Sequence, residues 1–288
     1  GGLFKKVVIS DYISINFVDR VFETPEMYSG FMNLMAVYGY SIQIYCDFSG
    51  YSDIAIGLAA LLGFRLPINF NSPYKALNIQ DFWRRWHMTL SRFLKEYVYI
   101  PLGGNRGSNF RTYNNLLATF IIGGIWHGAG WTFVFWGFLH GVAIVINRMW
   151  HLTSIKLPTV VAWFITFNFV NVAWIFFRAK EWSDATKVLT SMFSLDNVIL
   201  PEMLNKKLYF LNEYGVEFGN FVTNIQGDFY TPLWLLIGFL IVTLFNNSNS
   251  KINNLVLNRN YLLLSSGLLG VQPACRSAHH ADEVRDFF

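Results

Sequence analysis

Long stretches without charged side chains constrain this sequence more than any other feature. Residues 112–147, 157–177 and 229–250 contain no Asp, Glu, Lys or Arg. Residues 29–64 carry only two acidic side chains, and residues 260–275 form a shorter apolar stretch. A helix needs about 20 mostly apolar residues to cross the hydrocarbon core of a bilayer. The sequence therefore predicts an integral membrane protein built from helices.

Composition supports this class and excludes others. Apolar residues make up 53% of the 288 residues and charged residues only 14%, against about 25% charged in an ordinary soluble domain. A disordered chain would be poor in apolar residues, and two cysteines are too few for a disulfide scaffold. A net charge of +4 is too mild to indicate nucleic-acid binding.

Two of the stretches are too long for one simple crossing. Residues 29–64 and 112–147 are each expected to hold either two helices or one helix and a re-entrant piece. Glycines can interrupt a helix, and the second stretch contains a group of them that predicts a break: Gly123, Gly124, Gly128 and Gly130.

The charges between the stretches indicate an orientation. Residues 65–111, 148–156 and 251–259 are basic, whereas residues 178–228 are richer in acidic side chains. Basic loops near membrane spans stay in the cytoplasm. We therefore expect these three basic segments inside the cell and residues 178–228 outside it.

Residues 81–100, DFWRRWHMTLSRFLKEYVYI, predict a basic amphipathic helix in the membrane surface, anchored by Trp83 and Trp86. His87 within it is either a site residue or a partner in a structural hydrogen bond. The following PLGGNR run, residues 101–106, predicts a tight turn; it lacks the pattern of a phosphate-binding loop. We include Asn105 and Arg106 as candidate substrate contacts.

Two histidines lie in the 112–147 stretch, within GGIWHGAGWTFVFWGFLHG. An ionisable group at membrane depth is costly and usually serves a function. His127 lies among glycines that let a substrate approach, and a neutral imidazole can act as a general base toward a hydroxyl. His140 follows thirteen positions later, and the alternative for both is a hydrogen bond between helices. Trp126, next to His127, is a further candidate substrate contact.

Other polar residues favour structural roles. Asp47 and Asp53 are predicted to pair with bases or to cap a helix that starts near them. Cys46 is predicted to be inert packing. The sequence contains neither a GxSxG motif nor zinc-type Cys/His spacing nor a dinucleotide fingerprint, so we predict neither a metal nor a bound cofactor.

Four blocks of the sequence follow one another in a recognisable order: GGLFKKVVISDYISINFVDRVF, QIYCDFSGYSDIAIGLAALLGF, FNSPYKALNIQDFWRRWHMTLSRFLKEYVYIPLGGNR and GGIWHGAGWTFVFWGFLHG. In this order they resemble the membrane-bound O-acyltransferases, in particular their bacterial alginate O-acetyltransferase and D-alanyl transfer branch. Residues 1–182 carry the strongest similarity. The resemblance implies that His127 is catalytic, that His140 has a secondary role, and that His87 contributes in a less defined way.

The resemblance also implies a fold. It is an all-α, polytopic membrane protein, with a ring of transmembrane helices that includes re-entrant and interfacial amphipathic helices. Residues 1–271 would form this domain. Residues 272–288 form an atypical polar tail, to which we assign no function. Family members usually have several more spans before the GLFKK block, so an N-terminally truncated chain is expected.

The implied reaction moves an acyl group to a hydroxyl of an extracytoplasmic polysaccharide or similar polymer. The resemblance favours acetyl as this group. Acetyl-CoA or an acyl carrier thioester would be the cytoplasmic donor and a substrate. A separate periplasmic or surface acyltransferase would be a partner. The protein itself would lie in the inner membrane of a bacterium, in contact with membrane lipid. The alternatives are a transporter or flippase for a lipid-linked or polymeric sugar, and a non-catalytic membrane scaffold.

Overall fold

The computed structural model describes residues 1–194, 198–219, 230–245 and 247, and it is mostly helical. Residues 2–23, here called the N-terminal helix, run without interruption through π-helical η1 (Phe4–Ser10), α1 (Asp11–Ile13), π-helical η2 (Ser14–Val18) and α2 (Asp19–Glu23). The chain continues through the following elements: η3 (Pro25–Met27), α3 (Gly30–Leu61), η4 (Pro73–Lys75), α4 (Ile79–Arg85), α5 (Met88–Leu94), π-helical η5 (Lys95–Tyr99), α6 (Asn109–His127), α7 (Trp131–His151), α8 (Thr159–Arg178) and α9 (Trp182–Met192).

A small segment of short helices and two strands follows α9. Strand β1 (Val198–Pro201) leads through η6 (Glu202–Leu204), α10 (Asn205–Leu208) and η7 (Tyr209–Tyr214) to β2 (Val216–Gly219), which pairs with β1 in parallel. Helix α11 (Thr231–Leu244) comes last. The predicted helical fold is confirmed in its main feature, and the described residues add this one short two-stranded sheet. Its Gly215 adopts a left-handed backbone (φ 81°) that turns the chain into β2.

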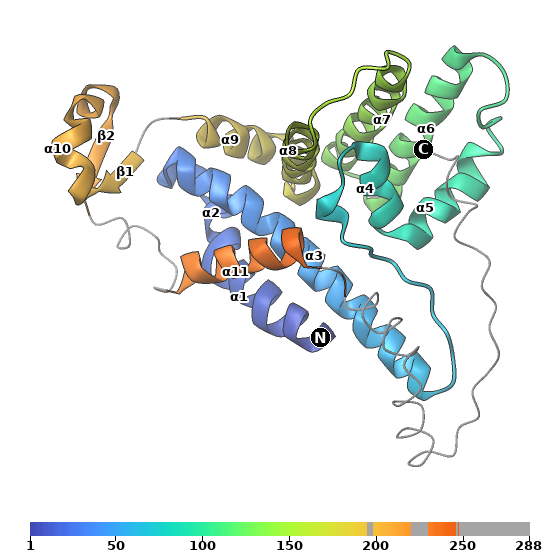
Figure 1. The fold of residues 1–288 in the computed structure, drawn as a ribbon, viewed down its shortest axis with the longest axis horizontal. Helices are drawn as coiled ribbons and strands as arrows, with labels where there is room; N and C mark the ends of the chain where they lie inside the picture. The colour runs from blue at the N-terminus through green and yellow to red at the C-terminus, as the bar shows by residue number, and fades with distance from the viewer. Residues whose placement is uncertain (195–197, 220–229, 246, 248–288) are drawn as a thin grey trace.

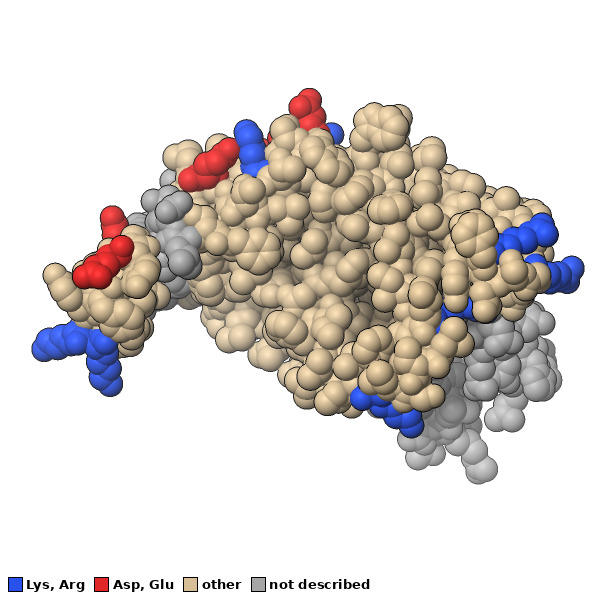
Figure 2. All heavy atoms as spheres, turned by 90° about the horizontal axis from the view of Figure 1, so that it is seen from above, with Lys and Arg blue, Asp and Glu red and all other residues tan. Residues whose placement is uncertain are grey.

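The helices gather in two groups (Figure 1). The N-terminal helix and α11 lie along α3 in one group, and α4 to α7 form the other, with α8 between the two. Figure 2 shows a face on which charged side chains stand mainly at the edges. Within the described residues, α7 and α8 are long and apolar enough to cross a membrane, whereas α11 is apolar but has only 14 residues.

The glycine break predicted in residues 112–147 is confirmed. Helix α6 ends at His127 and α7 begins at Trp131, so this stretch holds two helices. Residues 29–64, by contrast, form one helix: α3 has 32 residues, about 48 Å at 1.5 Å per residue. The expected helix start near Asp47 is wrong, because α3 passes through that position. The predicted stretch 260–275 and the tail 272–288 lie outside the described residues.

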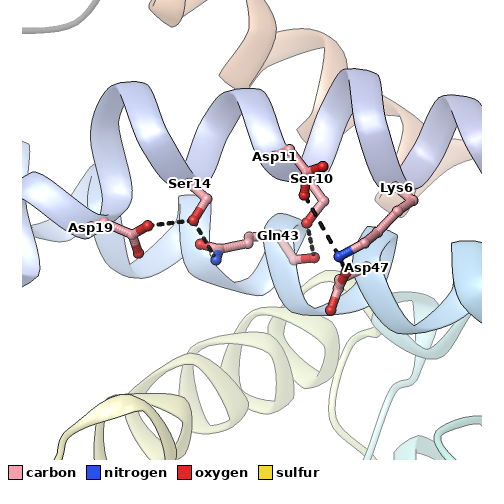
Figure 3. Close-up of polar contacts among 7 residues, drawn as sticks. All are labelled: Lys6, Ser10, Asp11, Ser14, Asp19, Gln43 and Asp47. Atoms are coloured by element: carbon pink, nitrogen blue, oxygen red, sulfur yellow. Dashed lines mark hydrogen bonds and ion pairs between the residues drawn. The ribbon is translucent and has the colours of Figure 1, made fainter.

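Polar side chains fasten the N-terminal helix to α3, which confirms ion pairing as the role of the two α3 aspartates. Lys5 Nζ lies 2.7 Å from Asp53 Oδ2, and Lys6 pairs with Asp47 (Figure 3). These pairs explain how charged residues are accommodated on a long helix of a membrane protein: each carboxylate meets an ammonium group of the neighbouring helix.

Removing Asp53 should destabilise the fold, because the Lys5 and Asp53 side chains are only 13% and 9% exposed. Asp53→Ala would leave the Lys5 charge buried, with an expected loss of about 3 kcal/mol in free energy of unfolding. The double variant Lys5→Met/Asp53→Ala should lose clearly less free energy of unfolding than the single variant, because no unpaired charge remains. Denaturation of the purified protein in detergent measures both. Equal losses in the single and double variants would contradict this account.

Candidate functional site

His127 lies at the end of α6, where Gly128 stops the helix and Gly130 precedes α7. Its ring is half-buried. Within the described part of the chain, neither ring nitrogen of His127 has a hydrogen-bond partner. A polar ring that is walled by protein but keeps both nitrogens free can meet the polar group of a substrate.

Aromatic rings enclose His127. The ring centroids of Phe177 on α8 and of Trp136 on α7 lie 5.0 and 5.2 Å away, both edge-on, and Phe133 lies at 6.5 Å. The neighbouring Trp126 ring stands at 5.0 Å and is 60% exposed. The predicted substrate contact Trp126 therefore forms an open wall of this site, and the other three rings form its protein side.

His140 has a different environment, because it is fully buried on α7. The indole Nε1–H of Trp83 donates to its Nδ1 at 3.2 Å. Trp136 packs against both His140, at 4.9 Å, and His127, so one indole ring links the two histidines. This hydrogen bond between α4 and α7 is the structural alternative considered for His140.

Close packing of α6 against α7 brings these residues together. A Cβ atom added to Gly124 would lie 2.3 Å from the carbonyl oxygen of Phe133, and one added to Gly137 would lie 2.3 Å from that of Phe120. Real Cβ atoms do not approach so closely, hence the two helices meet backbone to backbone only because both positions are glycine.

His87 interrupts the amphipathic helix predicted over residues 81–100. Helix α4 ends at Arg85 and α5 begins at Met88, and His87 itself has a left-handed backbone (φ 43°, ψ 56°). This conformation is uncommon for residues with a Cβ atom and is often retained at functional sites. The predicted role of Trp83 and Trp86 as headgroup anchors is wrong, since they are only 2% and 4% exposed.

The segment around Asn69 explains the break at His87. The backbone oxygen of Asn69 accepts from Met88 N at 3.0 Å, and its side-chain oxygen accepts from Thr89 Oγ1 at 2.6 Å. Asn71 N donates to the carbonyl of Arg85 at 2.9 Å. These bonds bracket residues 86 and 87 and therefore hold the irregular backbone in place. The helical periodicity of residues 81–100 does not predict these hydrogen bonds.

His87 lies within electrostatic range of His127. The His87 ring lies edge-on to Phe48 of α3 at 4.7 Å. Burial, together with the nearby His127 charge, lowers the pKa of His87 to about 4. Burial acts because it disfavours the charged imidazole. His87 is therefore neutral near pH 7.

The pKa of His87 predicts how acid affects stability. An unfolded histidine takes up a proton near its ordinary pKa of about 6.5, whereas folded His87 does so only near about 4. Between these values the unfolded state binds more protons, so acidification in this window destabilises the fold. Wild-type protein should lose more thermal stability between about pH 7 and pH 5 than His87→Asn, because Asn tolerates the left-handed backbone and does not titrate. Parallel curves for the two proteins would contradict the assignment.

Asn105 and Arg106 lie elsewhere. The predicted tight turn is confirmed: Gly103 and Gly104 have positive φ values, and both Asn105 and Arg106 are exposed. They precede α6, whose other end carries His127, so the length of α6, about 27 Å, separates them from it. The structure places Trp126 beside His127 and His140 behind Trp136. His87 lies within electrostatic range of His127, whereas Asn105 and Arg106 lie apart from it.

The described residues are mostly helical, and α7 and α8 are long and apolar enough to cross a membrane, as expected of a membrane protein. The family model of MBOAT, the membrane-bound O-acyltransferase family, matches residues 2–180, and the chain belongs to this family. It is 54% identical over 215 residues to a peptidoglycan O-acetyltransferase of Helicobacter pylori, covering 73% of this chain and 41% of the relative.

Two further relatives show the breadth of the similarity. A probable alginate O-acetylase of Azotobacter vinelandii is 44% identical, covering 71% of this chain and 41% of its own length. A teichoic acid D-alanyltransferase of Bacillus subtilis is 32% identical, covering 51% of this chain and 41% of that protein. The chain thus spans about two fifths of the length of these curated relatives.

Proposed function

We propose that this chain forms the histidine-bearing part of a membrane-embedded O-acyltransferase. It would move an acyl group, most simply acetyl, from a thioester donor in the cytoplasm to a hydroxyl of an extracytoplasmic glycan polymer. The single observation that carries the proposal is His127: a half-buried imidazole at a helix break, with both nitrogens unpartnered within the described residues. The names of the relatives, which include peptidoglycan and alginate acetylating proteins, support the acceptor class.

The chemistry follows from a neutral imidazole. One ring nitrogen of His127 accepts the proton of the acceptor hydroxyl while the hydroxyl oxygen attacks the thioester carbonyl carbon. The C–S bond then breaks, the thiolate takes the proton from the imidazolium, and the ester remains on the polymer. The aromatic walls restrict the motion of the His127 ring, and holding both substrates in line supplies a further part of the rate.

The two neighbouring histidines take different roles. His87 lies within electrostatic range of His127 and is neutral near pH 7, so it can donate a hydrogen bond to a substrate, or accept one from it, without carrying a charge. His140 is fully buried and accepts from Trp83, and we propose that it positions α4 against α7. Trp126, as the exposed wall, contacts the acceptor.

The charge pattern supports the direction of transfer. The loops expected in the cytoplasm are basic, and the pantetheine phosphates of coenzyme A or of a carrier protein are anionic, which favours their encounter on that side. The proposal includes a polytopic ring of helices in a bacterial inner membrane, and a separate extracytoplasmic acyltransferase that completes the transfer.

The experiment that tests the proposal compares cells that carry wild-type protein with cells that carry His127→Ala at equal membrane levels. Ester groups on the exported polymer and the amount of polymer exported are measured separately. Loss of esters with normal export is expected. Loss of export itself would indicate a transporter, and unchanged esters and export would indicate a scaffold.

A further inference from the structure

Three consecutive residues at the end of α8 contact three different parts of the chain. Phe177 packs against His127, Arg178 pairs with Asp19 of the N-terminal helix, and the carbonyl of Ala179 accepts from Thr132 Oγ1 at 3.2 Å. The position of Phe177 therefore depends on what holds its two neighbours.

Arg178 is held by the N-terminal helix and α3. Its guanidinium forms the ion pair with Asp19 and stacks 5.7 Å from the ring centroids of Phe22 and Tyr40. Cation–π contacts of this kind add to an ion pair and restrict the plane of the guanidinium. Among the described residues, the buried Nε of Arg178 has no hydrogen-bond partner, so Asp19 supplies the directional anchor.

Asp19 is itself fixed by a short series of hydrogen bonds (Figure 3). Ser14 Oγ donates to Asp19 Oδ2 at 2.5 Å, and Gln43 Nε2 of α3 donates to Ser14 Oγ at 2.9 Å. Residues of two helices therefore fix the position of the Asp19 carboxylate that pairs with Arg178. A side chain held in this way can transmit its position to its partner.

Phe177 links the anchored end of α8 to His127 through a ring contact. Its ring lies 5.0 Å from the His127 ring, 5.2 Å from Trp136 and 5.3 Å from Phe133. A shift at the end of α8 would move Phe177 away from His127 and leave the imidazole free to turn. Small displacements of a reacting group have large effects on rate.

We propose that Asp19 and Arg178 are positioning residues for His127, acting through Phe177. The inference rests on the proposed function for its effect on acyl transfer, but not for its effect on the His127 ring. Asp19 and Arg178 are 159 positions apart, and their contact ties the residue next to Phe177 to the N-terminal helix, in addition to the hydrogen bond from Thr132 to Ala179.

The first experiment measures the ring directly. Diethyl pyrocarbonate modifies accessible imidazoles, and mass spectrometry of protein in native membranes gives the rate at His127 relative to exposed His151. Asp19→Asn should raise that relative rate roughly fivefold, the size expected when about one net hydrogen bond is lost. Glu26→Gln is the matched control, because Glu26 pairs with Lys187 at 3.4 Å, also between the N-terminal segment and a later helix, but far more exposed. An unchanged rate in Asp19→Asn would overturn the proposal.

The second experiment tests the route through Phe177. Asp19→Asn and Phe177→Leu should each lower kcat of acetyl transfer about tenfold with little change in KM, and the double variant should be no worse than Phe177→Leu alone. Asp19→Glu, which keeps the charge, should recover most of the loss. Multiplied losses in the double variant would overturn the route. A changed modification rate combined with full activity of His127→Ala would instead refute the proposed function and leave the positioning intact.

Discussion

His127→Ala should lower O-acylation of the exported polymer by about 10²- to 10⁴-fold, the usual contribution of a general base. The structure gives the physical reason. The imidazole is the polar group at the α6–α7 break, and the rings of Phe177, Trp136 and Phe133 surround it on the protein side. Alanine would leave an apolar pocket unable to accept the hydroxyl proton. Released ester groups per mass of exported polymer are the measurement.

His151→Ala is the matched control for this variant. His151 lies at the other end of α7 and is exposed, so its removal should leave ester content unchanged. Membrane levels of all three proteins must agree, because a folding defect would also lower ester content. Ester content within about twofold of wild type in His127→Ala would contradict a general-base role, since even weak general bases contribute more than this.

Gly137→Ala should have the largest effect on the fold. The new methyl group would lie 2.3 Å from the carbonyl oxygen of Phe120, which is backbone and cannot rotate away. Helix α7 would have to move away from α6. That movement would take Trp136 away from His127, and His140 away from Trp83. Overpacking of this kind costs about 3 kcal/mol, and misplacement by about 1 Å lowers a rate about 10²-fold. Thermal unfolding in detergent and ester formation per folded protein measure the two effects.

Gly57→Ala is the control for the glycine substitution itself. Gly57 lies on α3 with nothing within 4 Å of an added Cβ atom. Alanine there should be neutral or stabilise by up to about 1 kcal/mol, because it favours the helix and meets no neighbour. If Gly137→Ala behaved like Gly57→Ala, the close approach of α6 and α7 would not be needed for stability or for the site.

Local chemistry made some features of the fold predictable and indicated a residue to test. A histidine beside glycines in a charge-free stretch indicated His127, and the same glycines predicted the break that ends α6. Acidic residues in an apolar stretch require partners, so ion pairing of Asp47 and Asp53 could also be predicted. The helix break and the ion pairs are confirmed, because helix breaking and the cost of an unpaired charge are properties of single residues and short segments. The role of His127 stays a prediction.

The errors concern residues whose role depends on distant neighbours. An ideal helix over residues 81–100 would place Trp83 and Trp86 at a surface, but both are buried because the helix breaks at His87. The break depends on hydrogen bonds from residues 69 and 71. In the same way, spacing alone could not distinguish the open His127 from the fully buried His140.

The sequence by itself determined the membrane class, the family, the division of the longest apolar stretch into two helices, and His127 as the residue to test. Each follows from composition, from motif order or from the chemistry of neighbouring residues. Only the tertiary structure decided that the helix breaks at His87, that His140 is enclosed behind Trp136, and that Arg178 meets Asp19. The physical reason is that packing between distant segments sets burial and side-chain partners, and such contacts leave no periodic pattern in the sequence.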